Sequence, residues 1–273
     1  MKHVIWACVV LLMAFPAFAA EKESSYDRVM RTGTLRCGYG IFQPMIMKDP
    51  NTGKISGIFA DIMEEIGKAA DIKVEFVEEV DWGQIPQALQ SGKIDAMCAG
   101  MWGTAKRGKS LAFSKPLFLS VAEAYARYDD KRFDHNLAAI NNANVTLSIN
   151  DGDVSQEIAD RMFPMAKRVS KIQMAGEDFL LMNVVTKKAD VTFTTPSIAM
   201  AYIKHNPKSL RQIPFDRPLG INRNVIGVDI HETELIRMLD VAVEELQYNG
   251  VIDQIFARYD PAVTSDFRLI SLK

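Results

Sequence analysis

The sequence contains few of the residues that metal-binding or disulfide-rich proteins need. It has three cysteines and four histidines in 273 residues, and the histidines stand far apart, without a spacing that resembles a metal site. Cys37 and Cys98 lie in apolar, strand-like stretches. An exported protein could oxidise them, yet free cysteine is itself among the most buried residue types. We expect two reduced core thiols, and no bound metal or cofactor.

An apolar run long enough to span a bilayer, about 20 residues, is missing from the amino terminus. Residues 4–15 are apolar, but Pro16 interrupts the run, and Lys2 precedes it. Ala17 and Ala19 then supply the small-x-small pattern that signal peptidase recognises. We therefore expect residues 1–19 to be a cleaved signal peptide, and the mature protein to be soluble and periplasmic.

A strong net charge is missing as well. The formal charge is -2, and removal of Lys2 with the leader changes it to -3. Neither value favours binding to nucleic acid or to an anionic membrane surface. The 48% hydrophobic and 24% charged residues are an ordinary globular mixture. After cleavage the chain is long enough for one large domain or for two lobes of about 100 to 150 residues each.

What the sequence does contain is an alternation of strand and helix patterns in two blocks. The first block places them at residues 34–39, 59–70, 73–77, 84–91 and 94–98. The second block places them at residues 145–149, 154–163, 169–172, 177–188, 190–194 and 197–204. Apolar residues recur at helical spacing in the longer segments. Strand–helix–strand units of this kind build parallel sheets flanked by helices.

Residues 92–116 carry the pattern most typical of ligand binding. An apolar strand runs through Gly100 and Gly103 to Thr104 and Arg107. In the first turn of a helix, this i, i+3 spacing places a hydroxyl, free N–H groups and a guanidinium where they can hold an anion. A guanidinium can also clamp a carboxylate through two parallel hydrogen bonds. Alone, T-x-x-R more often marks a solvated helix start, so its context decides.

That context resembles the periplasmic solute-binding proteins of amino-acid ABC transporters, family 3. The matching stretches are GKISGIFADIMEEIGKAADIKVEFV, WGQIPQALQSGKIDA, GMWGTAKR, LAFSKPL and a carboxy-terminal L-x-x-x-L-D-x-A-V-x-x-L-x-x-N-G-x-I-x-x-I series. The resemblance covers nearly the whole mature chain and is weakest between residues 129 and 144. It implies that Thr104 and Arg107 bind a ligand α-carboxylate, and that Asp61 and Asp95 are structural.

The resemblance also implies a fold and a mechanism. The fold is an α/β, two-lobed periplasmic binding protein of type II, with a mostly parallel sheet in each lobe and a two-strand hinge. We expect lobe 1 at residues 20–124 and 222–273, and lobe 2 at residues 125–221. Ligand touching both lobes favours the closed form, which is presented to the membrane subunits of an ABC permease. We expect a monomer that binds no nucleic acid.

Further candidate ligand contacts lie near strand ends of the first lobe. Phe42 and Trp82 follow strand ends and can face the cleft, although packing in the core is the more common fate of aromatic side chains. Met101 and Trp102 precede the T-x-x-R pattern and complete the set from this lobe.

The second lobe offers two turns that would face Arg107. In the first, Asp153 and Ser155 stand where the family usually has a G-x-T turn that helps to hold the carboxylate. Asp153 could instead be a plain N-cap, with Gln156 completing a capping box. The second turn contains Thr194 and Thr195.

Thr195 departs from the family pattern, because amino-acid binders commonly carry aspartate there to pair with the ligand's ammonium group. An ammonium buried beside threonine would be left unpaired at a cost of several kcal/mol. Three alternatives remain open: Asp153 supplies the counter-charge, Glu123 or another acid supplies it, or the ligand carries no amine.

Two other functions are compatible with the same architecture. Some relatives are periplasmic cyclohexadienyl (prephenate or arogenate) dehydratases, and an acid with a raised pKa would be needed for catalysis. The available acids are Glu79, Glu123 and Asp153. The other alternative is a soluble ligand-sensing partner of a membrane receptor. We expect a binding protein rather than an enzyme.

Overall fold

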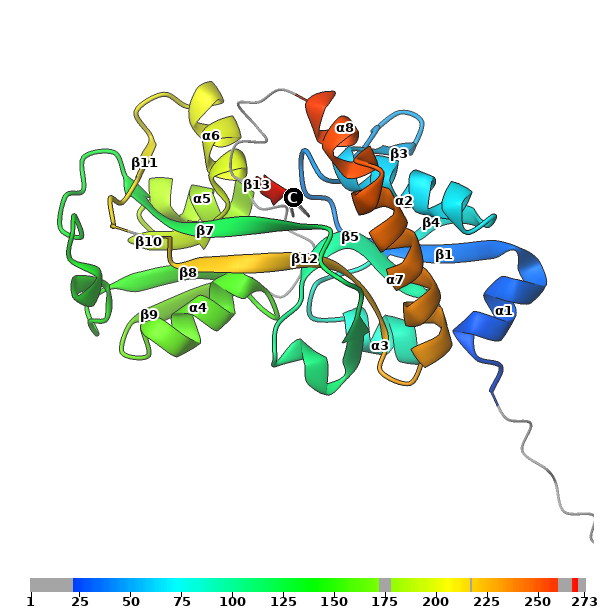
Figure 1. Cartoon of the computed structure of the whole chain (residues 1–273). Helices are drawn as coiled ribbons and strands as arrows, with labels where there is room; N and C mark the ends of the chain where they lie inside the picture. Colours follow the sequence, from blue (N-terminus) through cyan, green and yellow to red (C-terminus); the bar gives the residue numbers. More distant parts are fainter. Residues whose placement is uncertain (1–21, 172–177, 217, 260–266, 270–273) are drawn as a thin grey trace, which may run out of the picture.

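Two lobes share one sheet in the computed structural model, which describes residues 22–171, 178–216, 218–259 and 267–269. The expected signal peptide lies outside the described residues. Within them, the main path of the sheet runs in the order β4-β1-β5-β12-β7-β10-β8-β9. Figure 1 shows the two halves on either side of the long strands at the centre. The expected type II two-lobed fold is confirmed.

The first lobe is built on parallel strands. β1 (Thr34–Tyr39) pairs with β4 (Lys73–Glu79) and with β5 (Ala96–Trp102). The helices of this lobe are α1 (Ser25–Thr32), α2 (Ile58–Ala69), α3 (Ile85–Gln90), α7 (Thr233–Tyr248) and α8 (Val251–Ala257). On α2 the expected apolar face is fully buried, with Phe59, Ile62, Met63 and Ile66 at 0% exposure. Short strands complete the lobe: β2 (Met47–Lys48), β3 (Ile55–Ser56) and β6 (Leu111–Phe113).

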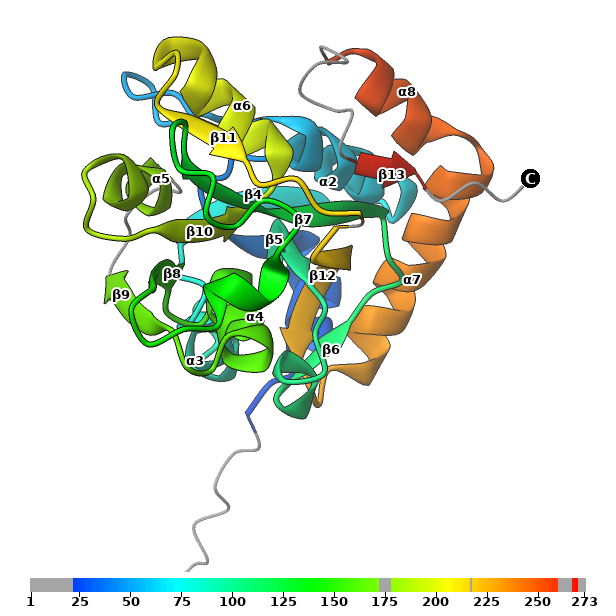
Figure 2. The same cartoon turned by 90° about the vertical axis from the view of Figure 1, so that its left-hand side faces the viewer.

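The second lobe repeats this arrangement. β8 (Thr146–Asn150) pairs in parallel with β9 (Lys167–Lys171) and with β10 (Val191–Thr194). Figure 2 shows α4 (Val154–Met162) on the opposite side of this sheet from α6 (Pro196–His205). The remaining elements are α5 (Asp178–Val185), β11 (Leu210–Gln212) and the 3-10 helix η2 (Leu137–Ile140).

Two long antiparallel strands join the lobes. β7 (Phe118–Arg127) pairs with β12 (Gly220–Asp229) along residues 118–122, and then with β10 along residues 123–126. β12 in turn leaves β7 to pair with β5 and β6. A last strand, β13 (Phe267–Leu269), pairs with β7 at residues 118–120. The lobes are therefore connected by two strands that each change partners midway.

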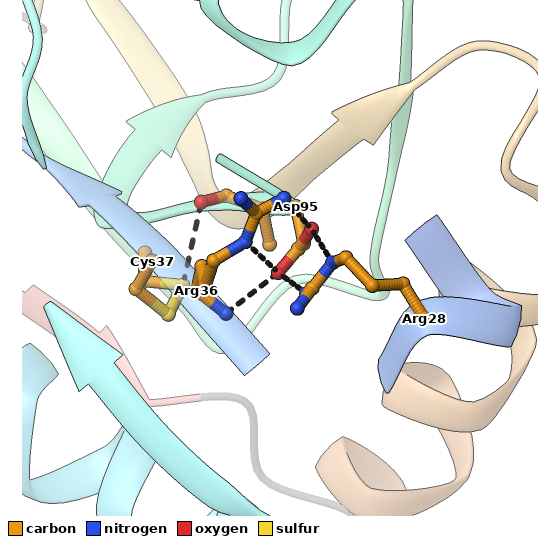
Figure 3. The surroundings of a disulfide bond; sticks show 6 residues. Arg28, Arg36, Cys37 and Asp95 are labelled. Atoms are coloured by element: carbon orange, nitrogen blue, oxygen red, sulfur yellow. Dashed lines mark hydrogen bonds and ion pairs between the residues drawn. A yellow bond between two sulfur atoms is a disulfide. The ribbon is translucent and has the colours of Figure 1, made fainter. Parts of the chain in front are cut away.

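The expectation of two reduced cysteines is wrong. Cys37 on β1 and Cys98 on β5 form a disulfide, with their Cα atoms 5.4 Å apart, and neither is exposed. The two strands are neighbours in the sheet, with Cys37 opposite Ala96. Burial in adjacent strands suits a free thiol and a disulfide equally, so the apolar pattern could not distinguish them. Figure 3 shows the bond beside the ion-pair cluster of Asp95.

The buried side chains form two clusters. The larger includes α2, α7, α8 and the strands of the first lobe, and it continues into α5 and α6. The smaller packs α4 against the second-lobe sheet. None of the helices in the described part of the chain combines the length and apolar composition needed to cross a membrane.

Candidate functional site

A small cavity lies between the lobes. One wall comes from the first lobe: Phe42, Trp82, Gly100, Met101, Trp102 and Arg107. The other wall comes from the second lobe: Asp153, Val154, Phe193, Thr194, Thr195 and Ile198. The cavity volume is ≈ 40 Å³, well below the roughly 150 Å³ of a cavity that holds benzene. The cavity therefore has to widen to admit an organic ligand.

Arg107 reaches across this cavity. Its Nη1 donates to the carbonyl oxygen of Trp102 at 3.1 Å, and its Nη2 donates to the carbonyl oxygen of Gly152 at 2.8 Å. The guanidinium carbon also lies 5.9 Å from the ring centre of Trp82. The first of these contacts is within lobe 1, and the second is with lobe 2. Arg107 therefore lies where both lobes converge, and its contact with a ligand carboxylate stays a prediction.

The structure places Thr104 outside the cavity wall. Its hydroxyl donates to Oε1 of Glu157, on α4 of the other lobe, at 3.0 Å. It also accepts the backbone N–H of Arg107 at 3.3 Å, which starts the 3-10 helix η1 (Arg107–Lys109). The T-x-x-R turn forms as expected, although as 3-10 rather than α-helix. A carboxylate contact by Thr104 remains a prediction.

Asp153 is both a wall residue and the N-cap of α4. Its Oδ1 accepts the backbone N–H of Val154 at 2.5 Å, and its Oδ2 accepts the hydroxyl of Ser155 at 3.1 Å. Gln156 does not complete the usual capping box, because its Oε1 accepts the N–H of Gly152 instead. Ser155 is fully buried beneath this turn and does not line the cavity. Ser155 thus orients Asp153, and its direct ligand contact stays a prediction.

The charges of Arg107 and Asp153 act on each other. Burial lowers the pKa of Arg107, while the negative charges of Asp153 and Glu157 oppose that shift. Burial likewise raises the pKa of Asp153, and the positive charge of Arg107 opposes it. Since a guanidinium keeps its proton at any physiological pH, its positive charge favours the ionised form of Asp153 on the facing wall.

Thr194 and Thr195 both lie on the cavity wall and are buried. The hydroxyl of Thr195 forms a hydrogen bond with that of Ser197 at 3.2 Å. Thr194 stands opposite Glu123 in the antiparallel pairing of β10 with β7. Glu123 is buried but is not part of the wall. Asp153 therefore supplies a carboxylate to the cavity wall, and Glu123 does not.

Aromatic and aliphatic side chains cover most of the remaining wall. The predicted wall residues Phe42, Trp82, Met101 and Trp102 all contribute. Sequence reasoning missed four others: Gly100, Val154, Phe193 and Ile198. Each is next to or close to a predicted residue in the chain, so proximity to the strand ends was the available signal. Among the described residues, no group of three or more His, Cys, Asp or Glu is arranged to hold a metal ion.

Solved structures of binding proteins have the same fold. An ancestral amino acid-binding protein, described as a precursor of cyclohexadienyl dehydratase, superposes with a TM-score of 0.74 at 24% identity, covering 87% of this chain and 99% of that one. An ancestral arginine-binding protein bound to arginine gives a TM-score of 0.72 at 27% identity, covering 83% and 98%.

Sequence comparison gives the family. A protein of Haemophilus influenzae named "Probable amino-acid ABC transporter-binding protein" is 24% identical over 264 residues, which is 93% of this chain and 96% of that one. Residues 35–261 match the family described as bacterial extracellular solute-binding proteins, family 3. Because this match spans most of the chain, the protein belongs to the bacterial extracellular solute-binding proteins of family 3.

Proposed function

We propose that this solute-binding protein holds an amino acid or another small carboxylate between its lobes and delivers it to the membrane subunits of an ABC permease. The observation that carries the proposal is the position of Arg107, whose guanidinium lines the cavity and donates hydrogen bonds to carbonyls of both lobes. We place the protein in the periplasm after cleavage of residues 1–19, acting as a monomer without nucleic acid.

Ligand binding would be an exchange of hydrogen-bond partners at Arg107. Opening the cavity separates Nη2 of Arg107 from the Gly152 carbonyl, with which it now forms a 2.8 Å hydrogen bond. A carboxylate can then accept two parallel hydrogen bonds from the guanidinium. A hydrogen bond to this charged acceptor is stronger than one to a neutral carbonyl. Closure over the ligand removes water and strengthens the pair further. The ligand therefore stabilises the closed form by its contacts with both walls.

The hinge would lie where the crossing strands change partners. In β7 the pairing passes from β12 to β10 between residues 122 and 123, and in β12 it passes from β7 to β5 at Asn224. These points support lobe limits near residues 124/125 and 221/222. Rotation there would move each set of parallel strands as a unit.

A binding role is better supported than the dehydratase alternative. Of the three acids considered for catalysis, Glu79 pairs with Lys48 at 3.1 Å, away from the cavity wall. Asp153 lines the cavity, but both of its oxygens accept hydrogen bonds that hold the start of α4. The relative from Haemophilus is named as a transporter-binding protein. We therefore propose a transport protein and not an enzyme.

The test is a thermal-shift screen of refolded protein against the twenty amino acids and a set of small organic acids. A ligand that binds only the native state raises the melting temperature by mass action. Calorimetry on Arg107→Ala should then show the loss of at least about 100-fold in affinity, as expected for a buried charged partner. Lys109→Ala is the matched control, because it removes an exposed positive charge from the same turn. Unchanged affinity in Arg107→Ala would contradict the proposal.

A further inference from the structure

We infer that Asp153 binds the ammonium group of the ligand, and that the ligand is an α-amino acid with an uncharged, mainly apolar side chain. The inference rests on the proposed function and adds to it the class of ligand and the residue that selects for the amine. It also decides among the three alternatives that the threonine at position 195 leaves open.

The two charged wall residues form a pair that matches a zwitterion. Arg107 enters from the first lobe and Asp153 from the second, and each lowers the electrostatic cost of burying the other. In a ligand with one negative and one positive group, the negative group can pair with Arg107 and the positive group with Asp153. These two contacts replace the attraction between the two residues. A simple carboxylate satisfies Arg107 but brings its own negative charge toward Asp153, which is unfavourable in a poorly hydrated site.

Asp153 retains the hydrogen-bonding capacity that an ammonium group needs. Its carboxylate accepts hydrogen bonds from the N–H of Val154 and from the hydroxyl and backbone N–H of Ser155. An ionised carboxylate has about four acceptor positions. At least one further position therefore remains, and the existing bonds fix the carboxylate in orientation. The fixed geometry lowers the entropic cost of binding the amine.

Thr195 complements this role without duplicating it. It lies on the same wall, and its hydroxyl already forms a hydrogen bond with Ser197 at 3.2 Å. A hydroxyl can accept a hydrogen bond from an ammonium group but cannot neutralise its charge. The counter-charge on this wall is supplied by Asp153, at the start of α4.

The rest of the wall favours an apolar ligand side chain. Phe42, Trp82, Met101, Val154, Phe193 and Ile198 present hydrocarbon surface to the cavity. With Arg107 and Asp153 paired to the ligand's own carboxylate and amine, a second charge on the ligand would be buried against this surface. Burial of an unpaired charge is strongly unfavourable. An aliphatic or aromatic side chain instead gains free energy from the burial.

The experiment compares amino acids with their matched acids that lack the amine. Calorimetry would measure L-leucine against 4-methylpentanoate and L-phenylalanine against 3-phenylpropanoate, with L-arginine and L-glutamate as charged probes. We expect the native protein to prefer leucine or phenylalanine over the matched acid by about 10- to 100-fold, the range for one hydrogen bond to a charged group. Arginine and glutamate should bind more weakly than either.

Asp153→Asn should abolish that preference, because it weakens the binding of the amino acid. The matched acid should bind to the variant as well as to the native protein, or better. Asparagine is a favourable N-cap, so α4 should keep its start, and circular dichroism would check the fold. Glu157→Gln is the control. It removes a negative charge that also acts on Arg107 from α4, but Glu157 does not line the cavity, so the preference should survive.

The outcomes separate this inference from the proposed function. If Asp153→Asn keeps the preference for the amine, or if arginine or glutamate binds best in an Arg107-dependent manner, the inference is wrong while carboxylate binding stands. If no amino acid or organic acid binds the native protein, the proposed function fails and the inference falls with it.

Discussion

At the residue scale, Asp95 shows how one buried carboxylate organises its surroundings. It is fully buried and accepts hydrogen bonds from Nε of Arg28 at 3.0 Å and from the backbone N–H of Arg36 at 2.7 Å. Both guanidinium groups also form ion pairs with it. Figure 3 shows the two arginines converging on the carboxylate from α1 and β1. The structural role expected for Asp95 follows from these contacts.

We predict that Asp95→Asn destabilises the protein by about 3–5 kcal/mol, because it leaves two partly buried guanidinium groups without their counter-charge. Urea unfolding followed by circular dichroism would measure the loss. Asp61→Asn is the comparison. Asp61 is also ion-paired, with Arg258, but its side chain is 32% exposed, so we expect a loss of about 1 kcal/mol or less. Equal losses in the two variants would argue against burial as the cause.

Residue types and spacing predicted part of the site and not the rest. Arg107 and Asp153 could be named because charged residues beside predicted strand ends are unusual unless they bind or cap. Thr104 and Ser155 were named by the same logic, yet their hydroxyl groups bond to Glu157 and Asp153. The partner of Thr104 is 53 residues away in the chain, so no local pattern could reveal it.

At the element scale, the disulfide closes a long loop around the centre of the first lobe. Cys37 and Cys98 are separated by 61 residues, and α2, β4 and α3 all lie between them. The bond therefore links β1 and β5 covalently across the intervening elements. In the chain-entropy view, restricting a loop of this length in the unfolded state stabilises the native state.

We predict that Cys37→Ala combined with Cys98→Ala lowers the free energy of unfolding by about 4 kcal/mol, the loop-entropy value for a closed loop of this size. Both side chains are buried, so alanine avoids burying a new polar group. The measurement is urea unfolding with and without reductant. Reductant should weaken the native protein and leave the double variant unaffected; a native protein indifferent to reductant would count against the bond.

Elements with a regular pattern could be predicted, and irregular ones could not. The range expected at residues 34–39 agrees with β1. The expected strand at residues 94–98 instead extends to Trp102, since pairing with Asn224 and Val225 of β12 carries it past Gly100. The two- and three-residue strands β2, β3, β6 and β11 were missed. A segment of two or three residues is too short to show the alternation of apolar and polar residues that indicates a strand.

At the scale of the whole molecule, the lobes meet backbone to backbone. Gly152 has a φ of +74°, and a Cβ added to it would lie 2.6 Å from the Cα of Gly83 on the other lobe. The hydrogen bond from Arg107 to the Gly152 carbonyl lies beside this contact. The distance between the lobes is thus set in part by the absence of a side chain at Gly152.

We predict that Gly152→Ala shifts the protein toward a more open form and weakens ligand affinity at least about tenfold, because affinity falls with the fraction of molecules able to close. Small-angle X-ray scattering should show a larger radius of gyration with ligand present. Gly83→Ala is the control, since its Cβ would meet ordinary contacts, the nearest being the Asp151 carbonyl oxygen at 3.6 Å. If both variants close normally, the two glycines do not limit closure.

The pairing of β7 has one more consequence. β12 and β11 occupy one of its edges, at residues 118–122 and 125–127, while β13 and β10 cover much of the other, at residues 118–120 and 123–126. An uncovered strand edge is a template for joining another chain. The strand in the proposed hinge is shielded in this way from pairing with other chains, which favours a dispersed state of the binding protein.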